Sequence, residues 1–163
     1  MLGFLKKTYE IIAPVSGKTL DLSDVPDEVF AQRLVGDGVA IEPTGDLIVA
    51  PADGELSLLF KTYHAFGLTL DNGTEVLVHI GIDTVKLKGE GFQALAKQGT
   101  RVKKGTPIVR INADFIKNKG YSLITPVLIT NPDSVSDIHF NTGINVEAGN
   151  DKLFTYKVKW FYR

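Results

Sequence analysis

The segment Thr62-Tyr-His-Ala-Phe-Gly-Leu-Thr-Leu-Asp-Asn-Gly-Thr-Glu-Val-Leu-Val-His-Ile-Gly81 has two apolar stretches on either side of Asp71-Asn-Gly73. This arrangement predicts a β-hairpin. Asn-Gly favours a two-residue type I′ loop, because both loop residues must adopt positive φ and the turn matches the twist of the strands. We therefore place the loop at Asn72-Gly73, with Asp71 facing Thr74.

In that register the two histidines of the segment come together. His79 lies opposite Phe66 and His64 lies opposite Gly81, so all four residues share one face. The histidines are then diagonal neighbours, at roughly 7 Å or less between Cβ atoms. A three-residue loop at Asp71-Gly73 would shift the register by one and place the rings on opposite faces. The length of the loop therefore decides whether the two histidines share one face and form one site.

The composition is that of one globular domain. The chain has 163 residues, 44% of them hydrophobic and 23% charged, which is enough to bury a single core. A net charge of -1 argues against a broadly basic surface for nucleic acid. The absence of cysteine excludes disulfides and thiolate chemistry, and it fits a cytoplasmic protein. No stretch approaches the roughly 20 apolar residues of a membrane span. We expect no secretory signal, because the N-terminal residues lack a long apolar core that ends in a small-residue cleavage site.

The N-terminus begins with a short apolar and basic segment, Met1-Leu-Gly-Phe-Leu-Lys-Lys7. We expect residues 1–10 to form a flexible lead and residues 11–163 to form the domain. As an alternative, a helical lead could touch an anionic membrane surface.

The rest of the chain reads as short strands separated by turns, which predicts an all-β sandwich or barrel with a few short helical turns. The expected strands are Leu47–Ala50, Leu56–Thr62, Leu68–Leu70, Thr74–Ile80, Thr106–Ile111, Val127–Ile129 and Leu153–Phe161. Helical turns are expected at Pro26–Arg33, where Ser23 and Asp24 are the capping-type residues that precede it, at Phe92–Lys97 and at Ala113–Lys117.

Paired imidazoles offer a route for phosphoryl transfer. A neutral histidine has one nitrogen lone pair that can accept a phosphoryl group, provided that its other nitrogen keeps a proton. The Gly81 carbonyl is a plausible acceptor for the His79 Nδ1 proton. His64 could then donate to the phosphoryl oxygens, and Thr62 could hydrogen-bond the His64 ring. Asp83 would make one side of the site acidic.

Other readings compete with this one. Paired strand histidines are often packing or hydrogen-bonding residues. His64, His79 and Asp83 could also ligate zinc, although no clear further ligand or water-activating acid accompanies them. The basic cluster Arg101, Lys103 and Lys104 lacks the glycine-rich loop of a nucleotide site. His139 has no partner pattern and reads as a surface or core residue.

Several longer motifs carry a resemblance over nearly the whole chain. They are Leu34-Val-Gly-Asp-Gly-Val-Ala-Ile41, Val49-Ala-Pro-Ala-Asp-Gly54, Thr62-Tyr-His-Ala-Phe66, Val78-His-Ile-Gly-Ile-Asp-Thr-Val85, Leu87-Lys-Gly-Glu-Gly-Phe92 and Val102-Lys-Lys-Gly105. In these motifs the chain resembles the glucose-family IIA component of the bacterial phosphoenolpyruvate-dependent sugar phosphotransferase system.

The resemblance implies an antiparallel β-sandwich and a role as histidine phosphocarrier. Such a protein takes a phosphoryl group from the small protein HPr and gives it to a cysteine on a IIB domain, which phosphorylates the incoming sugar. His79 matches the phosphorylated histidine and His64 its supporting histidine, while Thr62, Gly81 and Asp83 match site positions. No cofactor or metal is implied, although His64 and His79 could hold an adventitious or regulatory zinc.

The resemblance also implies a docking surface around a shallow depression. Phe60, Leu77 and Val85 would form its apolar rim, and Asp37 with Asp83 would meet basic partner residues. Regulated permeases or kinases are further expected partners, and membrane association would occur only through the permease. A different hypothesis makes the chain a regulatory module whose phosphorylation only switches its affinity for a transporter. The chain itself does not identify the sugar.

Overall fold

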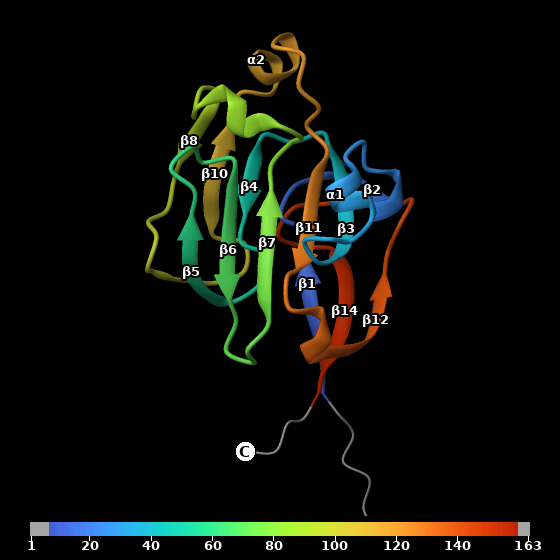
Figure 1. Cartoon of the computed structure of the whole chain (residues 1–163). Coiled ribbons are helices and arrows are strands. Elements are labelled where there is room, and N and C mark those ends of the chain that lie inside the picture. Colours follow the sequence, from blue (N-terminus) through green and yellow to red (C-terminus); the bar gives the residue numbers. More distant parts are fainter. Residues whose placement is uncertain (1–6, 160–163) are drawn as a thin grey trace, which may run out of the picture.

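The computed structural model describes residues 7–159, and short strands dominate this part of the chain (Figure 1). The strands are β1 (Thr8–Ile12), β2 (Gly17–Asp21), β3 (Asp37–Pro43), β4 (Leu47–Val49), β5 (Gly54–Leu59), β6 (Ala65–Thr69), β7 (Glu75–His79), β8 (Phe92–Ala94), β9 (Arg101–Val102), β10 (Pro107–Ile111), β11 (Thr125–Ile129), β12 (Val135–Phe140), β13 (Asn145–Val146) and β14 (Lys152–Val158). The α-helices are α1 (Glu28–Ala31) and α2 (Ala113–Asn118), and the 3-10 turns are η1 (Leu22–Asp24), η2 (Thr84–Leu87) and η3 (Pro132–Ser134).

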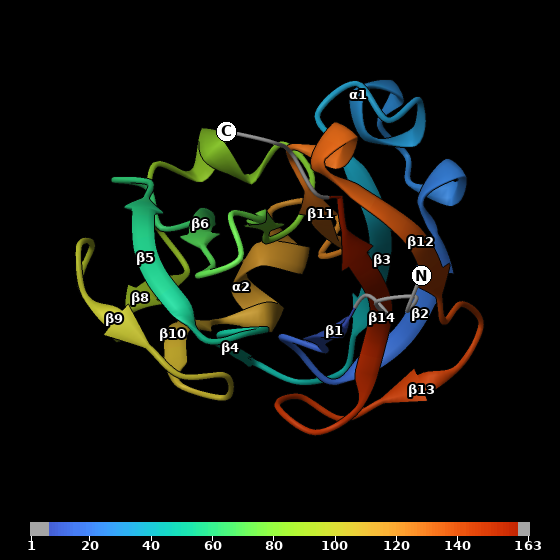
Figure 2. The ribbon, with the colours of Figure 1, turned by 90° about the horizontal axis from the view of Figure 1, so that it is seen from below.

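The strands form three antiparallel sheets. The largest has the order β13-β2-β3-β11-β7-β6-β5-β9, and the two smaller sheets are β1-β14-β12 and β4-β10-β8. Seen along the strands in Figure 2, the sheets surround a common interior and α1 lies outside it. The prediction of an all-β, antiparallel sandwich-like domain with a few helical turns is confirmed.

The sheets share one hydrophobic core. Phe66 and Val78 from the large sheet pack in one buried cluster with Ile108 and Phe154 from the smaller sheets. A second, smaller cluster lies under α1, where Phe30 packs with Leu22, Val25, Ala40, Ile82 and Leu128. The large sheet therefore buries side chains on both faces at this point. The second cluster fixes the short α1 segment against the sheet.

Two local predictions are wrong. Phe92–Lys97 is not helical, because Phe92–Ala94 pairs with β10 and Leu95 N–H donates to the Ile108 carbonyl at 2.8 Å. This pairing overrides the local sequence signal. The flexible lead does not extend to residue 10, because Thr8–Ile12 pairs with β14 as a strand. Residues 1–6 of the expected lead lie outside the described residues.

The other two helical predictions are confirmed in type, the first with shorter bounds and the second with one residue more. Pro26–Arg33 contains α1, whose N-cap is Asp27 rather than Ser23 or Asp24, with Asp27 Oδ1 accepting from Val29 N–H at 2.9 Å. Ala113–Lys117 falls within α2.

The predicted hairpin forms, but its register differs from the prediction. Phe66 faces Val78 and Ala65 faces His79, and the Leu70 N–H donates to the Thr74 carbonyl at 2.9 Å. The loop therefore has three residues, Asp71–Gly73, with Gly73 at φ 87°. Such loops commonly end in a residue with positive φ.

The Asn72 side chain accounts for the longer loop. Its Oδ1 accepts a hydrogen bond from Thr74 N–H at 3.0 Å, and its Nδ2 donates to the Tyr156 hydroxyl at 2.9 Å. Tyr156 lies on β14, far away in the sequence, so the loop is held by a tertiary contact. The loop length could not be read from Asn-Gly alone.

Candidate functional site

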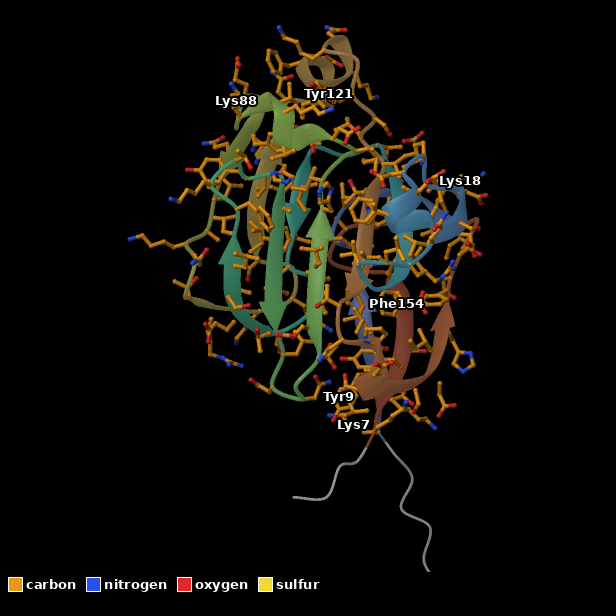
Figure 3. The ribbon with its side chains drawn as sticks, viewed as in Figure 1. Lys7, Tyr9, Lys18, Lys88, Tyr121 and Phe154 are labelled. Atoms are coloured by element: carbon orange, nitrogen blue, oxygen red, sulfur yellow. The ribbon has the colours of Figure 1, made fainter. Side chains whose placement is uncertain are left out.

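His79 is the last residue of β7, on the sheet face opposite the main core. Strand alternation buries its neighbours Val78 and Ile80 in that core and turns His79 the other way, with Leu77. In Figure 1 the arrow of β7 points toward the end of the molecule that carries α2, and His79 is the last residue of that strand. Lys88 and Tyr121 mark the same end in Figure 3, while Lys7 and Tyr9 mark the opposite end.

His64 reaches His79 because it lies outside the strand. β6 begins at Ala65, and Tyr63 before it has φ 58° in a turn closed by Tyr63 N–H donating to the Phe60 carbonyl at 2.8 Å. Strand alternation therefore does not extend to His64. The two imidazole centroids lie 5.0 Å apart at an interplanar angle of 83°. The register shift does not separate the rings, contrary to our expectation.

The backbone also links the two histidines. The Ile80 N–H donates to the His64 carbonyl at 2.6 Å, which continues the β6–β7 pairing by one hydrogen bond beyond the strand ends. Ile80, which follows His79, is thus bonded directly to His64. Their relative position is set by main-chain as well as side-chain contacts.

The Gly81 carbonyl fixes the protonation of His79. Its oxygen lies 2.8 Å from His79 Nδ1, as the sequence predicted. A carbonyl oxygen can only accept, so Nδ1 carries the proton and the neutral ring keeps its lone pair on Nε2. Gly81 itself has φ 82°, a conformation that glycine adopts without steric cost.

Burial lowers the pKa of His79. The Gly81 carbonyl opposes this effect by accepting from the ring, and the charges of Asp27 and Asp83 oppose it as well. Asp83 stands at φ 60° directly before η2, where its carboxylate acts on His79 as a nearby negative charge. The result is an imidazole that is neutral near pH 7 and able to use its Nε2 lone pair.

His64 is more deeply buried, with 3% of its surface exposed. Burial and the neighbouring His79 lower its pKa to about 4. Its Nδ1 lies 2.6 Å from Thr62 Oγ1, so the predicted contact of Thr62 with this ring is present. His64 is therefore a neutral ring at physiological pH, held by a hydroxyl on one nitrogen.

Two aromatic side chains enclose the imidazoles. Phe30 from α1 packs on His79 with 4.9 Å between centroids, and Phe60 packs edge-on to His64 at 5.1 Å. Sequence reasoning missed Phe30 and Asp27 as site residues. The only signal was the predicted helix at Pro26–Arg33, and nothing local indicates that this segment covers the hairpin.

A family model matches this chain over residues 9–135, and it describes the EIIA 1 component of the phosphoenolpyruvate-dependent sugar phosphotransferase system. The chain belongs to this family. As an EIIA component it is a phosphotransferase that takes a phosphoryl group from HPr and passes it to a IIB domain.

Individual relatives agree with the family. The glucose-specific EIIA component of Borreliella burgdorferi is 46% identical, over 87% of this chain and 76% of its own length. That of Bacillus anthracis is 42% identical over 98% of both chains. The solved glucose permease IIA of Mycoplasma capricolum superimposes with a TM-score of 0.87 at 35% identity, covering 94% of this chain and 99% of its own.

A related domain also occurs within a longer protein. The N-acetylglucosamine-specific EIICBA component of Klebsiella pneumoniae is 44% identical over 94% of this chain but only 24% of its own length. In that relative the matching part belongs to a longer EIICBA component.

The residues expected to dock partners of this EIIA chain differ in exposure. Val85 and Phe60 are 47% and 37% exposed, whereas Leu77 is half-buried and packs against the cluster under α1. Asp37 is engaged within the chain, because Arg33 Nε donates to it at 3.0 Å and Gly38 N–H donates to it at 2.9 Å. Its carboxylate is thus already paired with a cation.

Within residues 7–159, no group of three or more His, Asp or Glu side chains is arranged to hold a metal ion. No helix in the same range is long and apolar enough to cross a membrane. His139 lies exposed on β12, away from β6 and β7.

Proposed function

We propose that Nε2 of His79 is the atom that carries the phosphoryl group in this EIIA chain. The observation that supports this assignment most directly is the contact between His79 Nδ1 and the Gly81 carbonyl. It leaves the lone pair on Nε2, while Nδ1 keeps its proton. The nucleophile is thereby prepared without a separate base.

The transfer then needs no cofactor. The Nε2 lone pair forms a bond to phosphorus as the bond between phosphorus and the donor histidine nitrogen of HPr breaks, and that nitrogen takes back its electron pair. The Nδ1 proton stays with His79 in its hydrogen bond to Gly81. In the second step a IIB cysteine thiolate forms the new bond to phosphorus, and Nε2 recovers its lone pair. The charge on the phosphohistidine ring makes it a good leaving group.

His64 is assigned the role of phosphoryl stabiliser. As a neutral ring it carries one proton, and this role requires the Thr62 hydroxyl to donate to Nδ1, which puts the proton of the ring on Nε2. The 5.0 Å separation of the rings allows this N–H to donate to an oxygen of a phosphoryl group on His79. Such a donor stabilises the charge that is spread over the oxygens in a loose transition state.

The same proposal places the chain in the cytoplasm and in glucose uptake. The glucose-specific names of the Borreliella and Bacillus relatives support this sugar, while the N-acetylglucosamine-specific Klebsiella relative indicates that similar domains serve other permeases. The HPr and IIB proteins are the proposed direct partners. Val85, Phe60 and Leu77 are the proposed rim that contacts them. Regulated permeases or kinases stay a prediction.

The decisive experiment follows label from phosphoenolpyruvate through enzyme I and HPr to this chain, with a glucose IIB domain added last. We expect the wild type to gain label and to lose it to IIB, and His79→Gln to gain none. His64→Gln should still gain label but pass it on slowly, because its acceptor is intact. Label on His79→Gln would refute the assignment of the acceptor. Label that stays on the wild type with every IIB tested would favour the regulatory module instead.

A further inference from the structure

Thr84 is a fully buried polar residue at the start of η2. Its hydroxyl bonds to Ile80, the residue that follows His79 and bonds to the backbone of His64. The exposed surface of Thr84 is 0%. Its hydroxyl donates to the Ile80 carbonyl at 2.5 Å, across the loop that joins β7 to η2. A buried hydroxyl needs such a partner, and so does the buried carbonyl. The loop between residues 80 and 84 is thus closed by a side chain.

This loop has an unusual backbone. Gly81 has φ 82° and Asp83 has φ 60°, so two of its residues adopt left-handed conformations. For Asp83 that conformation is unfavourable and needs support from its surroundings. The support includes the Ile82 N–H, which donates to the Ser122 carbonyl at 3.0 Å, and the Thr84 hydroxyl.

Thr84 also packs against the residue that orients His79. A Cβ atom built on Gly81 would lie 2.5 Å from Cγ2 of Thr84 and 2.8 Å from the Ser122 carbonyl oxygen. The Thr84 methyl group and the Ser122 carbonyl therefore occupy the space beside Gly81 Cα. The peptide that follows Gly81 is also held by the Ile82 N–H, which donates to that Ser122 carbonyl, so the Gly81 carbonyl stays directed at His79 Nδ1.

We propose that Thr84 is a positioning residue for phosphoryl transfer, which holds the Gly81 carbonyl on His79 Nδ1 chiefly through its hydroxyl, while its methyl group fills the space beside Gly81. The inference rests on the proposed role of His79 as acceptor. Thr84 touches neither the phosphoryl group nor the imidazoles in this assignment. It acts through the loop whose carbonyl determines which nitrogen of His79 is free.

The contact with Ile80 extends this role to the second histidine. Ile80 accepts from Thr84 through its carbonyl and donates from its N–H to the His64 carbonyl at 2.6 Å. Ile80 is thus held at its carbonyl by Thr84, which supports the loop after His79, and at its N–H by the backbone of His64. Loss of the Thr84 hydroxyl would loosen the relative placement of both rings.

Three substitutions separate positioning from simple packing. Thr84→Val keeps the shape and removes the hydroxyl, Thr84→Ser keeps the hydroxyl and removes the methyl group, and Thr84→Ala removes both without adding bulk. The matched control is Thr19→Val, because Thr19 is also 0% exposed and its hydroxyl donates to a backbone carbonyl, that of Ile144. Thr19 lies on β2, three strands from β7 in the large sheet.

The first readout is the ¹⁵N spectrum of the His79 ring in the unphosphorylated protein. Wild type, Thr84→Ser and Thr19→Val should show one tautomer with the proton on Nδ1. Thr84→Val and Thr84→Ala should show a mixture of tautomers and faster exchange of the Nδ1 proton with water. A wild-type ring spectrum in folded Thr84→Val would overturn the proposal. If Thr84→Val does not fold, Thr84→Ala decides by the same criterion.

The second readout is single-turnover transfer from phospho-HPr, measured over a range of concentrations up to saturation. Loss of a group that orients a reacting residue commonly costs roughly 10- to 100-fold in rate. We expect Thr84→Val to lose rate in that range with little change in KM, and Thr84→Ser to recover most of it. An unchanged rate at saturation in folded Thr84→Val would also overturn the proposal. Failure of the wild type to accept label at His79 would instead refute the proposed function, and the ring spectrum would still test the positioning.

Discussion

The imidazoles of His64 and His79 stand nearly perpendicular, with 5.0 Å between their centroids. Two cations at this distance repel each other, and the protein surrounds both rings with apolar side chains. Burial, followed by the influence of His79, lowers the pKa of His64 to about 4. The pair is therefore neutral in the resting protein. A phosphoryl group on His79 would bring negative charge next to His64 and favour a proton there.

This arrangement predicts a loss of stability at mildly acid pH. The folded-state pKa of His64 lies below the ordinary value of 6.5, so its contribution is fully present above pH 6.5 and is lost as the pH falls toward 4. Over that interval the loss is about 1.4 kcal/mol per pH unit, on the order of 3 kcal/mol in total. Urea unfolding of the wild type and of His64→Gln between pH 7.5 and 4 measures it. Parallel curves for the two proteins would contradict the prediction.

A second prediction compares two glycines with similar positive φ angles. Gly81 has φ 82° and Gly73 has φ 87°, but a Cβ on Gly73 would meet nothing within 4 Å, whereas one on Gly81 would collide with Thr84 and the Ser122 carbonyl. A side chain in a left-handed conformation costs about 1–2 kcal/mol, which should be the whole effect of Gly73→Ala.

Gly81→Ala should cost more than Gly73→Ala in free energy of unfolding, because the backbone around residue 81 must also shift. It should lose phosphoryl transfer as well, because the carbonyl that orients His79 moves with that backbone. Gly73→Ala should transfer at the wild-type rate. Denaturant unfolding and single-turnover labelling of both variants check this comparison, and equal costs with normal transfer would refute it.

The sequence was sufficient to predict the type of fold and the proximity of the two histidines. Asn-Gly between apolar stretches specifies a hairpin, and Gly81 two residues after His79 places a carbonyl within reach of its ring. The loop length was not predictable, because the Asn72 side chain bonds to Tyr156 on β14. The register argument was wrong, yet the rings meet, because the turn at Tyr63 ends strand alternation before His64.

Other features of the site depend on contacts between distant segments. Phe30 reaches His79 only because α1 packs on the outer face of the large sheet, which no local pattern around residue 30 indicates. Phe92 has a sequence context that reads equally well as helix, and pairing with β10 makes it a strand. Asp37 reads as a free acidic residue, but Arg33, four residues earlier in the segment between α1 and β3, pairs with it.

A third prediction concerns Phe30. This side chain is 7% exposed and its ring packs on His79 at 4.9 Å, so it contributes to the burial that lowers the pKa of His79. Phe30→Leu should admit water to the imidazole and raise its pKa toward 6.5. The control is Phe92→Leu, because Phe92 is 9% exposed and lies in the main core. An NMR titration of His79 that is identical in Phe30→Leu, Phe92→Leu and the wild type would refute this role.

The fourth prediction tests the apolar rim. Val85 is 47% exposed on η2, beside the loop that follows His79. If HPr covers it, Val85→Ser should weaken binding by about 1 kcal/mol, which corresponds to roughly fivefold in KM. The rate at saturating phospho-HPr should stay within about twofold, because Val85 does not contact the imidazoles in the proposed mechanism.

Ile144 provides the control for Val85. It is 44% exposed, and its carbonyl and N–H bond to Thr19 at the edge of the large sheet where β13 lies, four strands from β7. Ile144→Ser removes a similar apolar surface at a place where docking over His79 does not reach. KM for phospho-HPr should therefore be unchanged in Ile144→Ser and raised in Val85→Ser. Equal KM values in the two variants would mean that HPr approaches His79 from a side that does not include η2, and the rim would then have to be sought around Phe60 and α1.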